Sequence, residues 1–217
     1  MKELLFKEMK LTASPLSYFF IAFSFMTFIP GYPILVGAFF VCMGIFYTFQ
    51  FSREYNDTLY TALLPVRKSD VVKAKYLFCI GIQIISFIIN IIITAIRLTA
   101  FKNSTVYIEN PLMNANFAYL GYVLIIFTLF NFIFLTGFFK TAYYIGKPFV
   151  IYCIVTFIVV ALGEILHHIP GLELLNSTTS DGFSIQIIVF IIGILIYIVG
   201  TYLSFIKSKK LFNTIDL

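Results

Sequence analysis

The sequence predicts an all-α protein that crosses a lipid bilayer six times, with its N- and C-termini in the cytoplasm. Hydrophobic residues make up 60% of the 217 residues and charged residues only 12%, whereas soluble domains carry about 25% charged residues. The apolar residues form runs of about 20 residues, long enough to cross the hydrocarbon core as helices. Basic residues gather between alternate runs, which favours one orientation. Lipid is therefore the expected solvent for most of the chain.

The first segment predicts a short helix lying in the membrane interface. Apolar Leu4, Leu5, Met9 and Leu11 alternate with charged residues at near-helical spacing, before a turn at Ser14-Pro15. Such an amphipathic helix can rest between headgroups and acyl chains. The alternative interpretation is that this segment is the frayed start of the first span.

Six spans are expected within a single membrane domain over residues 1–217. Their approximate ranges are 11–30, 33–51, 75–97, 117–139, 148–167 and 183–206. The first two are separated only by Ile29-Pro30-Gly31-Tyr32-Pro33, which is short and rich in turn-forming residues. We therefore expect these two helices to be antiparallel neighbours.

The distribution of basic residues predicts the orientation. With the N-terminus inside, only Arg97 and Lys102 of the 15 basic residues fall outside. The other basic residues would all be cytoplasmic, as is typical of membrane proteins. Glu109, Glu164 and Asp181 would lie at the outer face, together with Glu173.

The cytoplasmic loop 52–74, between spans two and three, has the pattern of a short amphipathic helix. Asp57 or Thr58 can cap this helix, Pro65 would end it, and Ser69 or Asp70 can cap the helix that follows. Leu59, Leu63 and Leu64 would form an apolar ridge beside charges of both signs, at Arg53, Glu54, Asp57, Arg67, Lys68 and Asp70. Such a surface suits a protein groove. A passive solvated loop remains the alternative.

This loop also resembles a known signature. It is similar to the "LPVSRKDIVKAKY" motif of small type 2 ABC-transporter permeases. The similar residues are Tyr55-Asn56-Asp57, followed by Leu63-Leu64-Pro65-Val66-Arg67-Lys68-Ser69-Asp70-Val71-Val72 and Lys73-Ala74-Lys75-Tyr76. The hairpin 30–33 and the span-two exit 44–50 are also similar. The resemblance covers about the first 80 residues and is shared with the membrane subunits of staphylococcal phenol-soluble-modulin exporters.

The resemblance implies a bacterial cell-membrane protein that forms half of a permease. A second permease copy or paralogue would supply the other half, and a separate ATPase would bind ATP and Mg. The segment from Tyr55 to Lys75 would hold the coupling helix that contacts the ATPase. The expected coupling residues are Glu54, Tyr55, Asp57, Leu63, Leu64, Pro65, Arg67, Lys68 and Asp70.

The chain contains no Walker A phosphate loop, so we expect no ATP hydrolysis, no cofactor and no catalytic residue in it. No feature of the sequence indicates a nucleic-acid partner. The polar residues expected inside the membrane are neutral: Gln83, Asn90 and Asn131. They would form interhelical hydrogen bonds or a polar strip along a translocation path.

Glu164, His167 and His168 share one helical face near the end of span five, and a metal-binding or catalytic role is one interpretation of this spacing. No other helix supplies matching ligands, and a polar interfacial edge is the favoured interpretation. Cys42, Cys79 and Cys153 lie in apolar runs without metal-ligand spacing. We expect them to pack as small hydrophobic residues.

The favoured functional hypothesis is an ABC exporter permease that moves an amphipathic or hydrophobic substrate outward, with cytolytic or antimicrobial peptides as the expected class. The alternative is a membrane immunity or substrate-binding protein without transport of its own. An intramembrane enzyme using Glu164, His167 and His168 is a third hypothesis. The residues leave open which substrate is moved and whether the permease pairs with itself.

Overall fold

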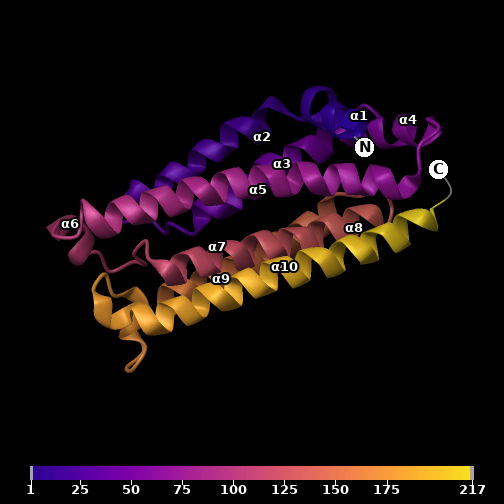
Figure 1. The fold of residues 1–217 in the computed structure, drawn as a ribbon. Coiled ribbons are helices and arrows are strands. Elements are labelled where there is room, and N and C mark those ends of the chain that lie inside the picture. The colour runs from indigo at the N-terminus through magenta and orange to yellow at the C-terminus, as the bar shows by residue number, and fades with distance from the viewer. Residues whose placement is uncertain (1, 216–217) are drawn as a thin grey trace.

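The computed structural model describes residues 2–215, except for the side chains of Leu59, Ala62 and Ser180. Within this range the regular elements are all helical, and most run nearly parallel or antiparallel in an elongated bundle (Figure 1). In chain order the elements are α1 (Lys2–Lys7), η1 (Glu8–Thr12), α2 (Pro15–Phe19), η2 (Phe20–Phe28), α3 (Val36–Glu54), α4 (Asp57–Leu63), α5 (Lys68–Thr99), α6 (Thr105–Ile108), α7 (Phe117–Leu129), η3 (Phe130–Leu135), α8 (Thr136–Phe139), α9 (Gly146–Leu166), η4 (Glu173–Asn176), η5 (Ser180–Gly182) and α10 (Phe183–Asn213).

Four helical stretches of the described chain are long and apolar enough to cross a membrane: α5, the continuous α7–η3–α8, α9 and α10. The bent pair Lys2–Thr12 and Pro15–Phe28 raises this number to five if it counts as one span. Helix α3 is not among them, and its last two turns carry Gln50, Arg53 and Glu54. A multi-pass helical membrane protein is therefore supported, and the six spans stay a prediction.

The N-terminal segment turns sharply before the first long stretch. The two parts of the bent pair meet at 92°. Ser14 has an extended backbone and its side chain accepts a hydrogen bond from the Leu16 N–H at 3.2 Å, while Pro15 occupies the first helical turn. Ser and Pro are favoured in these positions. The helix along the bundle therefore begins at Pro15, four residues later than the predicted start of span one.

The predicted caps of the cytoplasmic helices were wrong. Helix α4 is preceded by Asn56, which adopts a left-handed conformation (φ 52°) without a side-chain cap, and Asp57 is the first helical residue. Helix α5 begins at Lys68 after Arg67, also without a side-chain cap. The side chain of Asp57 is used elsewhere, as described below. The predicted end of α4 was close, since the helix stops at Leu63, two residues before Pro65.

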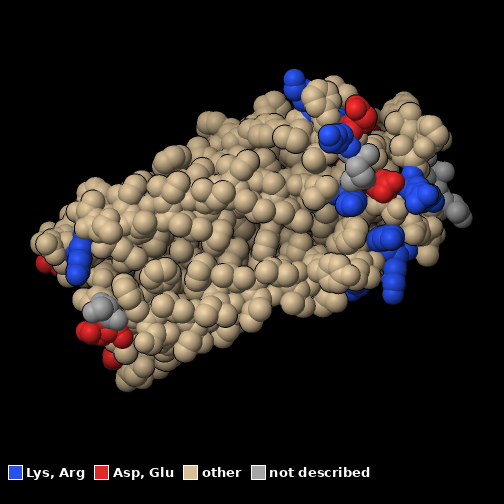
Figure 2. Space-filling view, viewed as in Figure 1, with Lys and Arg blue, Asp and Glu red and all other residues tan. Residues whose placement is uncertain are grey.

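The charged residues gather at the two ends of the bundle. Both termini and α4 lie at one end, and α6 lies at the other (Figure 1). On the face shown in Figure 2, Lys and Arg crowd the end with the termini, and the middle of the bundle carries no charge. A charge-free middle is what a helix bundle needs to sit in hydrocarbon. We refer to the two ends as the basic end and the α6 end.

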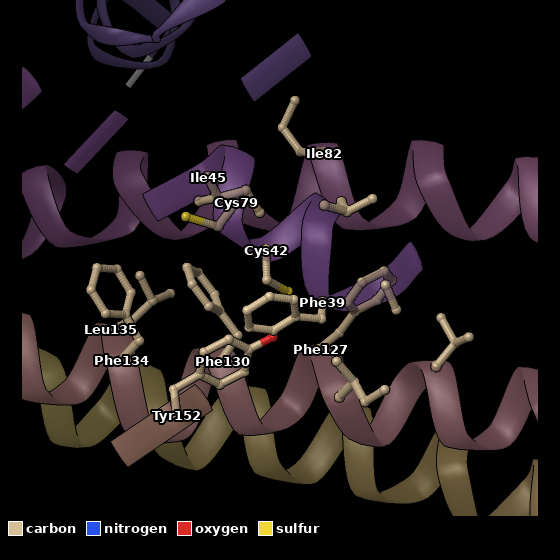
Figure 3. Close-up of a cluster of buried hydrophobic side chains, with 14 of the residues drawn as sticks. Phe39, Cys42, Ile45, Cys79, Ile82, Phe127, Phe130, Phe134, Leu135 and Tyr152 are labelled. Carbon is tan, nitrogen blue, oxygen red and sulfur yellow. The ribbon is translucent and has the colours of Figure 1, made fainter. Parts of the chain in front are cut away.

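The core lies between α3 and α5 on one side and α7, η3 and α9 on the other. Figure 3 shows Cys42, Cys79 and Phe39 facing Phe130 and Tyr152 across this layer. These five side chains are buried. The two cysteines are free and pack as small apolar residues.

Helices α7 and α10 approach closely through glycines. A Cβ atom added to Gly193 would lie 2.6 Å from the Gly121 carbonyl oxygen, and one added to Gly121 would lie 2.7 Å from the Val189 carbonyl oxygen. Small residues let helix backbones meet closely in membranes, where packing contacts drive association. This contact fixes α10 against α7.

Candidate functional site

Helix α4 presents apolar side chains to the outside at the basic end of the bundle. The side chains of Tyr55, Tyr60, Leu63 and Leu64 are 72%, 65%, 72% and 53% exposed. Tyr60 and Leu63 belong to α4, and Tyr55 and Leu64 flank it. Four exposed large apolar residues this close together, beside exposed Arg67, are typical of a docking surface for another protein. We call these four residues with Arg67 the α4 surface.

The other predicted coupling residues lie near the α4 surface and differ in their exposure and contacts. Glu54 and Pro65 are exposed, and Glu54 accepts a hydrogen bond from Gln50 at 3.1 Å. Asp70 is half-buried. The Lys68 ammonium donates to the Ile215 backbone oxygen at 2.6 Å, which ties the loop to the C-terminal segment.

Asp57 does not lie on the exposed side that the sequence predicted for it. Its carboxylate turns inward and pairs with Lys75 of α5 at 3.2 Å and with Lys7 of α1. Ser52 of α3 and Thr12 of η1 each donate a hydroxyl hydrogen bond to it at 3.2 Å. Four elements thus meet at one carboxylate on α4.

A buried ion pair completes this network. The Lys75 ammonium lies 3.0 Å from the Glu8 carboxylate, and both side chains are almost fully buried, at 2% and 1% exposed. Lys7 also contacts Glu8 at 3.1 Å and donates to the Thr61 hydroxyl of α4 at 2.7 Å. We call Lys7, Glu8, Asp57 and Lys75 the base network, because it holds the base of α4 to α1, η1 and α5.

Sequence reasoning missed the base network. It counted Lys75 among the cytoplasmic basic residues and as the last residue of the expected coupling segment, and it counted Glu8 among the charged residues of an interfacial helix. A signal was present, because Leu4 and Glu8 are four residues apart and therefore share one helical face. Both side chains are buried in the structure.

The pKa of the Asp57 carboxyl lies below its ordinary value of 3.8. Burial alone would raise this pKa, but the nearby ammonium groups of Lys75 and Lys7 outweigh burial by attraction and hydrogen bonding. Asp57 therefore remains a carboxylate at neutral pH, and its two ion pairs persist under ordinary conditions.

A hollow of about 390 Å³ separates α4 from the segment that leads into α2. Residues 11–15 line one side, and Ser52, Tyr55 and Tyr60 lie on the other. Helix α4 therefore lacks close packing on the side that faces this hollow.

Gln83 and Asn131 pair with each other inside the bundle. Their side-chain amides exchange two hydrogen bonds, at 2.9 and 3.0 Å, between α5 and η3. Asn131 also donates to Thr201 of α10 at 3.0 Å, and Tyr197 of α10 donates to Gln83 at 2.9 Å. This is the interhelical hydrogen bonding that the sequence offered as one interpretation of these amides.

A second row of polar contacts runs toward the basic end. The Tyr76 hydroxyl of α5 lies 2.6 Å from Ser204 and 2.8 Å from Ser208, both on α10. Ser204 also contacts Thr136 of α8 at 3.0 Å. Together with Gln83 and Asn131, these residues link α5, α8 and α10 along their length.

Asn90 lies nearer the α6 end, in a separate cluster. Its side-chain oxygen accepts from Thr27 at 3.2 Å and from Tyr119 at 3.1 Å. Its amide nitrogen is buried without a hydrogen-bond partner in the described part of the chain. Asn90 thus joins α5 to η2 and α7 and does not share one continuous strip with Gln83.

Glu164 and His167, near the end of α9, contact the backbone of the loop that precedes α7. Glu164 accepts a hydrogen bond from the Met113 N–H at 2.8 Å, and the His167 ring lies 3.1 Å from the Pro111 oxygen. In the described residues, no group of three or more His, Cys, Asp or Glu side chains could hold a metal ion. These contacts anchor loop 109–116 to the end of α9, which agrees with a polar interfacial edge.

Comparison with known proteins assigns a family. A family model described as "ABC-2 family transporter protein" matches residues 3–213, almost the whole chain. No curated protein and no solved structure shows significant similarity to the chain.

Proposed function

Because this chain belongs to the ABC-2 transporter family, we propose that it exports an amphipathic or hydrophobic substrate by using α4 as its coupling helix. Family membership makes it a permease subunit of an ABC transporter, with the membrane and an ABC ATPase as its partners. The exposed apolar surface on α4, joined by buried charges to the bundle, carries the proposal for coupling.

The α4 surface provides the contact with the ATPase. Leu63 and Leu64 would enter an apolar groove of the ATPase, while Arg67 would pair with an acidic residue at its rim. Buried apolar anchors supply most of the energy of such interfaces, and the surrounding charges supply orientation. ATP and Mg would be bound by the ATPase chain.

The base network provides the connection from α4 to the transport helices. Asp57 contacts Lys75 of α5 and Lys7 of α1, so displacement of α4 acts on both elements at once. Coupling requires the bundle to have two arrangements, one of which the nucleotide-bound ATPase favours. The hollow beside α4 leaves room for such a displacement.

A second permease copy or paralogue would complete the pathway. Helix α9 exposes Val150, Ile154, Ile158 and Ile165 at 54–58%, at intervals that place them along one side. This apolar face suits either lipid or the matching helix of a second permease. The substrate class, cytolytic or antimicrobial peptides, rests on the resemblance of the first 80 residues to peptide exporters.

Co-purification with candidate ATPase subunits tests the proposal. The triple variant Leu63→Ala, Leu64→Ala and Arg67→Glu should lose the ATPase that the wild-type chain retains in detergent, because it removes the apolar anchors and reverses the neighbouring charge. The matched control is Val106→Ala, Ile108→Ala and Lys102→Glu, which makes the same kinds of change at exposed residues of the α6 end.

ATPase binding by the control but not by the α4 variant would support coupling through α4. Equal binding by both variants would show that the ATPase contacts another surface. If the wild-type chain retains no ATPase, a membrane immunity or substrate-binding protein becomes the better account.

A further inference from the structure

A groove at the basic end, separate from the α4 surface, combines an apolar wall with a basic rim. Its volume is about 690 Å³, and it lies where α8, the following turn and α9 meet the end of α3. Ile133, Ile145, Pro148 and Ile151 supply the apolar wall. The groove is large enough for part of an acyl chain and its headgroup.

Three cations line this groove, and none of its lining residues is acidic. They are Arg53 of α3, Lys140 after α8 and Lys147 in the first turn of α9. None of the three forms an ion pair with another described residue. Three uncompensated positive charges beside an apolar surface favour a ligand with one anionic and one apolar part.

Neighbouring tyrosines place the groove at headgroup depth. Tyr144 lines it, and Tyr143 lies beneath the Arg53 guanidinium at 5.9 Å; both rings are exposed. Tyrosine is enriched where hydrocarbon meets water, because its ring is apolar and its hydroxyl is polar. The charged rim thus lies where lipid phosphates would be, with Ile133 and Ile151 on the hydrocarbon side.

We propose that this groove binds an anionic phospholipid from the leaflet at the basic end. The phosphate would lie among Arg53, Lys140 and Lys147, and an acyl chain would cover the isoleucine wall. The cytoplasmic leaflet is the anionic one, and the positive charges orient this end toward it. The proposal does not depend on coupling or transport, since a lipid would occupy the groove without the ATPase.

Native mass spectrometry of the full-length chain in detergent tests this site. Phosphatidylglycerol should give a one-to-one adduct, whereas phosphatidylcholine with the same acyl chains should bind roughly tenfold more weakly. The double variant Lys140→Gln/Lys147→Gln should weaken the phosphatidylglycerol adduct by a similar factor. The control Lys209→Gln/Lys210→Gln removes two exposed lysines at the same end, outside the groove, and should bind as the wild type does.

Equal weakening of both double variants, or equal binding of the two lipids by the wild type, would overturn the proposal. Displacement of phosphatidylglycerol by an equimolar amount of inorganic phosphate would also overturn it, because the site would then recognise a free anion. A photoactivatable phosphatidylglycerol tests the wild-type chain without substitution. Its cross-links should fall within residues 133–151 or at Arg53, which line the groove, and cross-links confined to other segments would contradict the assignment.

Discussion

Lys75 shows how a basic residue near a span end can serve a purpose other than topology. It is almost fully buried and contacts both Glu8 and Asp57. Removing a charge from water is costly, so a buried lysine persists where carboxylates and hydroxyls surround it. Here the surrounding groups come from η1, α3 and α4, so the lysine specifies how these elements meet.

Replacement of Lys75 by methionine should destabilise the protein by about 3 kcal/mol, because it leaves Glu8 buried with only Lys7 as a cationic partner. The matched control is Lys73→Met, which removes an exposed lysine from the same helix. Thermal unfolding of the two variants in the same detergent measures the difference. Equal unfolding temperatures would contradict a structural role for the base network.

At the scale of elements, the contact between α7 and α10 depends on two glycines. Gly121 and Gly193 face each other with no room for a side chain between the backbones. Within lipid, such close packing replaces the hydrophobic driving force that holds helices together in water. The hydrogen bond from Asn131, in η3 directly after α7, to Thr201 of α10 further specifies how these two helical stretches are oriented.

The variant Gly193→Ala should be less stable than the wild type by about 1–3 kcal/mol, because its methyl group would overlap the Gly121 backbone. Gly81→Ala is the control: Gly81 lies within α5, and an added Cβ meets nothing within 4 Å. Since alanine is favoured over glycine in helices, the control should unfold at the same or a higher temperature. A loss of stability in both variants would argue against a specific α7–α10 contact.

At the scale of the whole molecule, the charges divide the bundle into two ends and a middle. The basic end holds the termini, α4 and the base network, and on the face shown in Figure 2 acidic residues lie at both ends (Figures 1 and 2). The hairpin after η2 belongs to the α6 end, because the Tyr107 hydroxyl donates to the Phe28 oxygen at 2.9 Å. Arg97 strengthens this attachment by donating to the Thr27 oxygen at 2.9 Å.

This arrangement predicts which positions a membrane-impermeant thiol reagent reaches in intact cells. Pro30→Cys and Asp181→Cys should react from outside, whereas Lys209→Cys should react only after the membrane is opened. The wild-type chain measures the background from its own cysteines, of which Cys42 and Cys79 are buried and Cys153 is partly buried. Labelling of Lys209→Cys in intact cells would indicate the opposite orientation. An unreactive Pro30→Cys would contradict an external first hairpin.

The coarse fold could be predicted because hydrophobic run length and charge bias act locally along the chain. Helices α9 and α10 begin within two residues of their predicted starts, and α7 begins at the predicted residue. The start of α5 was predicted to within about two residues from Ser69 and Asp70, although the helix begins at Lys68 without a side-chain cap. The end of α10 could not be predicted as well. That helix continues beyond the predicted end at residue 206 to Asn213, because a helix can continue into water where hydropathy no longer marks it.

The sequence by itself determined that the chain is a helical membrane protein with most of its basic residues at one end, and it predicted a short apolar helix after span two, with a passive loop as the alternative. Only the tertiary structure decided that Asp57 faces inward, that Glu8 and Lys75 pair, and that Gln83 meets Asn131 while Asn90 does not. The physical reason is that periodicity specifies which residues share a helical face, whereas pairing depends on how separate helices rotate and pack. Residues 67 positions apart, such as Glu8 and Lys75, are brought together only by that packing.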